Sequence, residues 1–297
     1  MIYEIYHETS FDYVALVTFS HNIARLKPKN CNTQKLIEYS LKINPTPYEV
    51  NEFIDYFGNT NNFMLIREAH KRLSVIATSK VERLENEINK ELEILQESKI
   101  TLKEATQRLS KYHPEDVFAK QFLFETDSIP MPNDEIKEYA LQSFKENRNL
   151  YEACNEFMGR IFHDFKFVSG FSNITTPIEI VFKEKKGVCQ DFAQFAISSL
   201  RSIGIPARYI SGYLQTTSKE GKEKLFGADA SHAWFSIYIP GFGWVDFDPT
   251  NNKIPNQEYI LLGYGRDYLD ISPLKGVVQS SGYSLLNVKV NVERVIT

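Results

Sequence analysis

The stretch GVCQDFAQFAISSL, residues 187–200, decides the fold that we predict for this chain. After the cysteine at position 189, apolar residues recur at steps of three and four, which predicts a helix with one buried face. The residues on that face are Phe192, Ala193, Ala196, Leu200 and Ile203. Asp191, Gln194, Ser198 and Arg201 fall largely elsewhere on the helix. Cys189 therefore lies at or just before the first turn of a buried amphipathic helix.

The position of Cys189 at a helix start is compatible with a reactive thiol. The unpaired N–H groups and the positive dipole end of a first turn stabilise an anion such as a thiolate. Helix N-termini are among the places where the pKa of a cysteine falls from about 8.5 to about 3.5–7.5. A free cysteine is also often a small buried core residue. Position alone leaves both interpretations open.

Two aromatic-rich segments further along the chain favour the reactive interpretation. Residues 231–240 and 241–250 have the composition of two strands joined by a tight Pro-Gly turn. His232 lies at the start of the first strand and Asp248 at the end of the second, so a hairpin makes them neighbours. A histidine held by a carboxylate is the usual base for a nucleophilic cysteine. A core histidine and a turn aspartate are the commoner roles of each alone, but together the residues predict a Cys-His-Asp site.

The carboxylate itself is ambiguous on these grounds. Asp246 and Asp248 are two residues apart, so both point to one face of an extended strand. Either could reach His232. The end of a strand is where a site opens, which weakly favours Asp248.

These motifs resemble those of bacterial transglutaminase-like proteins, which belong to the papain-like cysteine-enzyme superfamily. The matching segments, in the family's order, are GVCQDFA (187–193), GIPARY (204–209), SGY (211–213), HAW (232–234) and GWVDFDPTN (243–251). The resemblance implies that Cys189 is the nucleophile and His232 the base. Because the family carries its aspartate in an Asp-Pro-Thr sequence, it also implies that Asp248 orients the histidine.

Further residues could support this chemistry. Asp191 is expected to stabilise the backbone at the start of the helix, with a supporting role in catalysis possible. The backbone N–H of Cys189 is the natural first donor to an oxyanion, and Tyr213 or a backbone group of residues 165–170 could be the second. Gln190 follows the cysteine, so the glutamine donor of papain-type enzymes is not visible. Trp234 of the HAW motif and Asp246 complete the supporting set.

The rest of the chain predicts an α+β protein with two domains. Residues 1–83 contain several short strands, which predict a small β-sandwich or barrel. This segment resembles the N-terminal β-domain of bacterial relatives. Residues 84–297 are expected to form the catalytic domain, mostly helical over 84–165, with the core and a final strand over 166–297. We find no chemical role for residues 84–130, and we expect residues 216–227 to form a loop near the mouth of the site.

Composition bounds the possible functions. A net charge of -4 over 297 residues gives no sign of nucleic-acid binding. Three scattered cysteines, Cys31, Cys154 and Cys189, are too few for a disulfide framework or a zinc site and suit a reducing compartment. The first residues lack the pattern of a signal peptide, and no apolar run is long enough to span a membrane. We expect a cytoplasmic protein with a peptide or protein substrate and without a cofactor or metal.

The predicted activity is acyl transfer from an amide bond through a thioester on Cys189. Bacterial proteins with this layout are more plausibly hydrolases, so a protease or amidase is the preferred prediction. A protein-glutamine transglutaminase would use the same three residues with an amine acceptor. Two other classes stay open: a thiol-dependent acyltransferase or a peptide N-glycan-type amidase, and a peptide-binding module that keeps the fold without turnover.

Overall fold

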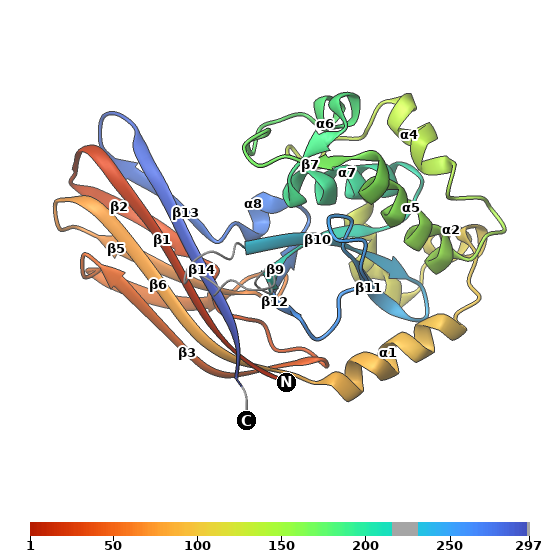
Figure 1. Cartoon of the computed structure of the whole chain (residues 1–297), viewed down its shortest axis with the longest axis horizontal. Helices are drawn as coiled ribbons and strands as arrows, with labels where there is room; N and C mark the ends of the chain where they lie inside the picture. The colour runs from red at the N-terminus through yellow and green to blue at the C-terminus, as the bar shows by residue number, and fades with distance from the viewer. Residues whose placement is uncertain (216–230, 296–297) are drawn as a thin grey trace, which may run out of the picture.

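A computed structural model describes residues 1–215 and 231–295, so the loop expected at 216–227 lies outside the described residues. The chain has a β-rich part and a mixed α/β part that lie side by side (Figure 1). The α+β prediction is confirmed.

The β-rich part is a sandwich of two four-stranded antiparallel sheets. One sheet has the order β14-β1-β6-β3 and the other β13-β2-β5-β4. Ala24 and Met64 from one sheet and Val75 from the other share a buried core, as predicted for a β-sandwich. The strands from the N-terminal segment are β1 (Ile2–Val17), β2 (Phe19–Ala24), β3 (Gln34–Asn44), β4 (Glu49–Ile54), β5 (Thr60–Ile66) and β6 (His70–Arg83).

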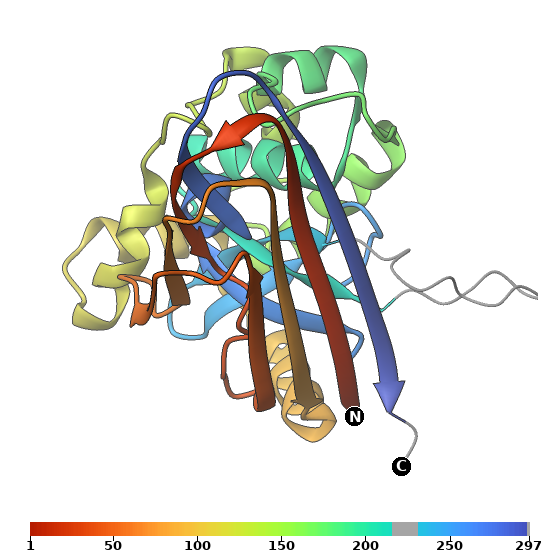
Figure 2. The same ribbon diagram turned by 90° about the vertical axis from the view of Figure 1, so that its left-hand side faces the viewer.

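The last two strands correct the expected domain division. We expected residues 84–297 to form the catalytic domain, but β13 (Leu274–Gln279) pairs with β2 and β14 (Ser284–Val295) pairs with β1. The final strand was predicted, but its partner was not. Alternating apolar residues indicate a strand without indicating which sheet edge it completes. Figure 2 shows β14 alongside β1, with the start of β1 and the end of β14 at the same end of the sandwich.

The predicted helical segment follows the sandwich. An extended stretch at 98–101 divides its first part into two helices, and Asn133 caps a later one by accepting the backbone N–H of Ile136 at 3.0 Å. The elements are α1 (Glu85–Glu97), α2 (Leu102–Ser110), η1 (Pro114–Asp116), α3 (Val117–Lys120), η2 (Gln121–Leu123), α4 (Asp134–Leu141) and α5 (Leu150–Asp164).

The mixed α/β part is built on a four-stranded antiparallel sheet with helix α7 (Cys189–Ser202) packed across it (Figure 1). We call it the catalytic sheet, after the predicted site residues that it carries. The strand order is β11-β10-β9-β12. The remaining elements are β7 (Lys166–Phe167), α6 (Ile178–Glu184), β8 (Lys186–Gly187), β9 (Ala207–Leu214), β10 (Ser231–Ile239), β11 (Gly243–Phe247), β12 (Tyr259–Gly265) and α8 (Tyr268–Ile271).

Helix α7 is enclosed on all sides, which the amphipathic pattern did not predict. Every residue from Asp191 to Arg201 is buried. Its polar side chains find protein partners: the hydroxyl of Ser198 donates to the Pro130 carbonyl at 2.6 Å, and Arg201 donates to the Ala207 carbonyl. Because buried polar groups are stable only when they are hydrogen-bonded, these contacts allow the helix to form the centre of the core.

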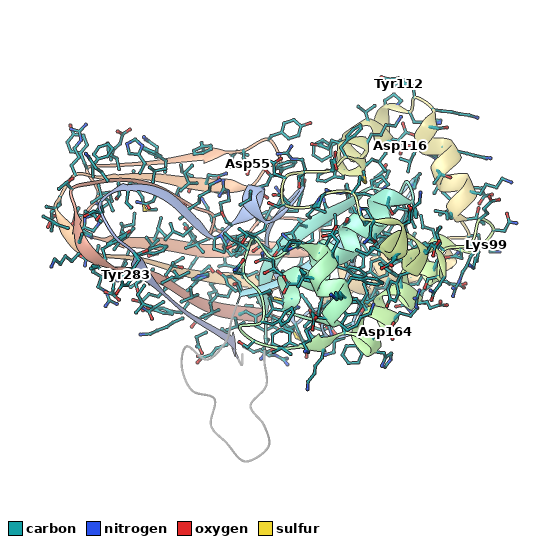
Figure 3. The ribbon with its side chains drawn as sticks, turned by 90° about the horizontal axis from the view of Figure 1, so that it is seen from above. Asp55, Lys99, Tyr112, Asp116, Asp164 and Tyr283 are labelled. Atoms are coloured by element: carbon teal, nitrogen blue, oxygen red, sulfur yellow. The ribbon has the colours of Figure 1, made fainter. Side chains whose placement is uncertain are left out.

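The sandwich and the catalytic sheet share a second apolar cluster. Tyr3 and Ile5 of β1 and Val292 of β14 are buried against Tyr213 of β9 and Ile260 of β12. Seen from above, side chains of both parts extend into the region between them (Figure 3). The sandwich therefore supports strands β9 and β12, and β9 pairs directly with β10, the strand that carries His232.

We expect Gly212→Ala to destabilise the protein by about 1–3 kcal/mol or more, because overpacking a core forces its neighbours to move. A Cβ at Gly212 would lie 2.2 Å from the Ile260 carbonyl oxygen and 2.5 Å from the ring of Trp234. Gly159→Ala is the matched control. Its Cβ meets nothing closer than 3.5 Å inside α5, so alanine should stabilise that helix by about 0.5–1 kcal/mol. Urea unfolding of both variants measures the difference, and equal stabilities would contradict it.

Candidate active site

Local contacts fix the backbone around Cys189. The cysteine is the first residue of α7, and Val188 alone separates it from β8, which pairs in parallel with β7. The Asp191 carboxylate accepts the backbone N–H of Val188 at 2.7 Å and the hydroxyl of Ser172. A Cβ at Gly187 would lie 2.8 Å from Cβ of Asp191, so only glycine fits there without movement. These contacts agree with the structural role expected of Asp191, and burial raises the pKa of its carboxyl.

The three predicted side chains converge. His232 is the second residue of β10, and its Nε2 lies 2.7 Å from Oδ2 of Asp248. The same ring is hydrogen-bonded to the side chain of Cys189. Because Asp248 occupies Nε2, Nδ1 is the nitrogen left for the thiol. Cys189 is partly exposed, so solvent and substrate can reach its sulfur.

The register of the hairpin explains why Asp248, and not Asp246, reaches the histidine. Ser236 of β10 pairs with Asp246 of β11, and extending this register by two residues sets Asp248 opposite Trp234. His232 lies two residues along β10 from Trp234, which faces Asp248, and four residues from Ser236, which faces Asp246. Asp248 is therefore the nearer carboxylate on that face. Asp246 instead accepts the indole N–H of Trp234 at 2.9 Å.

Asp248 is held by donors that sequence reasoning missed. Its side chain is fully buried. Oδ2 accepts the Tyr259 hydroxyl and the Asn251 amide, both at 2.7 Å, and Oδ1 accepts the backbone N–H of Thr250 at 2.9 Å. Asn251 is the last residue of the GWVDFDPTN motif, so the sequence pointed to this segment without assigning a role to Asn251 itself. Tyr259 comes from β12 and has no sequence pattern that ties it to the site.

Two supporting residues have different roles from those expected. Tyr213 cannot be the second oxyanion donor, because its hydroxyl is buried against the sandwich and lies 2.8 Å from Nδ1 of His7. Its position on β9 places it at the boundary between the two parts of the chain. Trp234 packs beside the imidazole of His232, with ring centroids 5.9 Å apart, and contacts Asp246 through its N–H. It supports the histidine ring from the side.

The backbone segment that was the other candidate donor does lie near Cys189. Residues 166–167 form β7, and the N–H of Val168 donates to the Gly187 carbonyl at 2.9 Å. That N–H is therefore occupied. The N–H of Cys189, at the N-terminus of α7, stays the first candidate donor.

The electrostatics of the site favour a charged histidine. Burial lowers the pKa of His232, but hydrogen bonds to Asp248 and Cys189 outweigh burial and raise the pKa to about 10. Burial raises the pKa of Asp248, but the hydrogen bonds from His232, Asn251 and Tyr259 lower it by more than burial raises it. The pKa of Asp248 is therefore below its ordinary value. The pair is therefore an imidazolium and a carboxylate at neutral pH.

We expect the pair to stabilise the protein less at alkaline pH. Because folding raises the pKa of His232 to about 10, its stabilising contribution is complete below about pH 6.5, the pKa of an exposed histidine, and is lost as the pH rises toward 10. Urea unfolding at about pH 6 and pH 9 should show a larger loss of stability for the wild type than for Asp248→Asn. Equal losses would contradict the charged pair.

Metal-type ligands gather in one place away from these residues. Within residues 1–215 and 231–295, His113, Glu115 and Asp116 are the group whose ligand atoms lie close enough together for an ion. Asp116 already contacts Nε of Arg108 at 2.9 Å and the hydroxyl of Tyr238 at 2.7 Å. These contacts give the group a structural role in attaching the helical segment to β10.

A cysteine at the start of a helix that packs on an antiparallel sheet, beside a histidine and an aspartate on that sheet, defines a protein of the papain-like fold. Comparisons with known proteins agree. Residues 3–82 match the bacterial transglutaminase-like N-terminal region, and residues 137–249 match the transglutaminase-like superfamily. The chain belongs to the transglutaminase-like superfamily.

Individual relatives extend this match. An uncharacterised protein of Mycobacterium tuberculosis is 34% identical over 298 residues, which cover 98% of this chain and 92% of that protein. A protein-glutamine gamma-glutamyltransferase of Pseudomonas aeruginosa is 31% identical over 102 residues, 32% of this chain and 15% of that one. A crystal structure of a provisionally assigned cysteine protease from Cytophaga hutchinsonii has the same fold, with a TM-score of 0.76, 22% identity, and coverage of 100% of this chain and 91% of that one.

No helix within the described residues is both long and apolar enough to cross a membrane.

Proposed function

We propose that this protein is a cysteine-dependent acyl-transfer enzyme that hydrolyses amide bonds of peptides or proteins, that is, a protease or amidase. The observation that carries the proposal is the chain of contacts from Cys189 to the ring of His232 and on to Asp248. Its partner is a peptide or protein substrate. The three unpaired cysteines support a reducing, cytoplasmic site of action.

The geometry supports a sequence of steps. Cys189 and His232 form a thiolate–imidazolium pair, in which the thiol proton already lies on His232. The thiolate forms a bond to the carbonyl carbon of the substrate amide. The negative oxygen then lies near the N–H of Cys189 and the positive end of α7. As the C–N bond breaks, the imidazolium gives its proton to the leaving amine, and a thioester remains on Cys189. Water, deprotonated by His232, attacks the thioester and releases the acid and the thiol.

Transamidation is the second candidate, and a specific observation favours it. The 102-residue likeness to a protein-glutamine gamma-glutamyltransferase is evidence for an amine acceptor in place of water. The two reactions share the thioester and differ in what resolves it. Pocket shape at the acceptor side decides between them.

Product analysis separates these possibilities. Peptide substrates are incubated with the wild type and with Cys189→Ala, in the presence of a fluorescent primary amine, and the products are identified by mass spectrometry. We expect free acids from the wild type and none from the variant. Amine-linked products in excess of free acids would favour the transglutaminase. Binding of peptides without either product would favour the non-catalytic module.

A further inference from the structure

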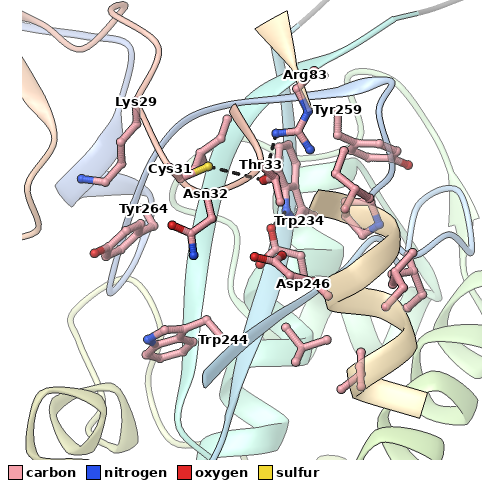
Figure 4. A pocket seen from close by; sticks show the side chains of 18 of the residues that line it. Lys29, Cys31, Asn32, Thr33, Arg83, Trp234, Trp244, Asp246, Tyr259 and Tyr264 are labelled. Atoms are coloured by element: carbon pink, nitrogen blue, oxygen red, sulfur yellow. Dashed lines mark hydrogen bonds between the residues drawn. The ribbon is translucent and has the colours of Figure 1, made fainter. Parts of the chain in front are cut away.

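A cavity of about 310 Å³ lies between the sandwich and the catalytic sheet (Figure 4). Three parts of the chain form its walls: residues 29–33 of the N-terminal segment, helix α1, and the face of the catalytic sheet that carries Trp234. Within the described residues, Cys189, His232 and Asp248 are not part of its lining. The cavity is therefore separate from the candidate active site. Helix α1, for which the sequence predicted no role, forms one of its walls.

Two arginines that line this cavity each have one buried donor atom without a partner within the described residues. Arg208 lies between two aromatic rings, its guanidinium carbon 4.2 Å from the centroid of Trp244 and 3.9 Å from that of Tyr264. Its Nε is buried and unpaired within the described residues. The same holds for Nε of Arg83, whose residue is 6% exposed. A buried donor without an acceptor is costly, so both arginines point to an acceptor that would enter the cavity.

The charges around the cavity favour an anion. Lys29, Arg83 and Arg208 outnumber the acidic lining residues Glu91 and Asp246. The acidic Asp246 is already paired with the indole N–H of Trp234 at 2.9 Å. Lys29 donates to the backbone carbonyls of residues 57 and 58, and the terminal nitrogens of Arg83 donate to protein oxygens. The guanidinium of Arg208 contacts the Tyr264 side chain and keeps its buried Nε without an acceptor within the described residues. The planar fork of an arginine matches a carboxylate better than it matches a spherical anion.

The opposite wall is apolar. Ile88, Leu92 and Leu95 of α1 and Ile254 line it, and two tryptophans stand beside it. A cavity of this size with a few convergent polar groups and apolar walls is typical of a small-molecule site.

We propose that this cavity binds a small organic carboxylate with an apolar or aromatic body. The carboxylate lies at the guanidinium of Arg208, and the body lies against α1. The same chemistry has two sources, a free organic acid and the C-terminal carboxylate of a peptide. Trp234 and Tyr259 line the cavity and contact the residues of the Cys-His-Asp site, so the ligand would lie one side chain away from that site.

Intrinsic fluorescence tests the proposal directly, because the chain has two tryptophans and both line the cavity. The wild type is titrated with phenylacetate, with N-acetyl-Ala-Phe, and with the amide of each acid. We expect a saturable change in tryptophan emission with an acid and an affinity at least about tenfold weaker for its amide. Saturation by phenylacetate indicates a free acid as the source, and saturation by the dipeptide alone indicates a peptide terminus. Equal binding of acid and amide, or no saturable change with either acid, would overturn the proposal.

Variants test the assigned contact by calorimetry. Arg208→Lys keeps the charge but loses the planar fork, and we expect the affinity for the acid to fall about tenfold. Arg148→Lys, in a partly exposed ion pair with Glu156 that is not part of the cavity lining, is the matched control and should bind like the wild type. If Arg208→Lys does not fold, Leu92→Phe fills the apolar wall from a half-buried position and should weaken binding in its place. A folded variant at either position that binds like the wild type would contradict the assigned contacts.

Discussion

Cys189→Ala should lower kcat/KM for a peptide amide by at least about 10⁴-fold, because the thioester cannot form without the sulfur. The side chain is partly exposed at the start of α7 and packs against the edge of the core, and alanine keeps its Cβ, so the variant should fold normally. Initial rates with a fluorogenic peptide measure the loss, and thermal unfolding checks the fold.

The other two cysteines are the matched controls. Cys31 is exposed and Cys154 is buried in the core. Cys31→Ser should keep the wild-type rate. If Cys189→Ala kept more than about a hundredth of the activity, the nucleophile would have to be sought elsewhere.

Asp248→Asn should lower kcat by roughly 10³–10⁴-fold, with a much smaller change in KM. The carboxylate accepts from His232 and holds it as an imidazolium, and a neutral amide cannot do so. An amide has one acceptor oxygen where the carboxylate has two, and its NH₂ group can only donate. The asparagine side chain therefore cannot accept all the hydrogen bonds that the carboxylate now accepts from Tyr259, Asn251 and the backbone of Thr250. The alkaline limb of the pH profile should move to lower pH in the variant, because His232 loses the partner that raises its pKa.

Asp246→Asn is the control that the hairpin provides. It changes the same residue type on the same face of β11, two residues earlier, and its partner is the indole of Trp234. We expect its kcat to stay within about tenfold of the wild type, since no charge on His232 depends on it. Similar losses in the two variants would mean that the carboxylates act through the fold and not through the histidine.

The sequence was sufficient to predict the parts of this protein that depend on local pattern. The apolar spacing after Cys189 predicted the helix, and the aromatic strands around the Pro-Gly turn predicted the hairpin that joins His232 to Asp248. Of the two candidate aspartates, the weak preference for Asp248 agrees with the register of that hairpin.

Long-range contacts were beyond the same reasoning. No sequence pattern predicted that the final strand pairs with the first one, because alternating apolar residues indicate a strand but not its partner. Tyr213 was quoted in a motif beside the site, yet its hydroxyl turns toward His7 of the sandwich, since adjacent residues of a strand point to opposite faces. Tyr259 reaches Asp248 from a strand whose sequence gives no hint of the contact.

The central claim is that sulfur, imidazole and carboxylate work as one unit, and alkylation of the cysteines by iodoacetamide at about pH 6, followed by peptide mapping, tests it most directly. An imidazolium beside the sulfur favours the thiolate. We predict that Cys189 is modified faster than the exposed Cys31, and that His232→Ala removes this advantage. Modification of Cys189 no faster than Cys31 in the wild type would contradict the account.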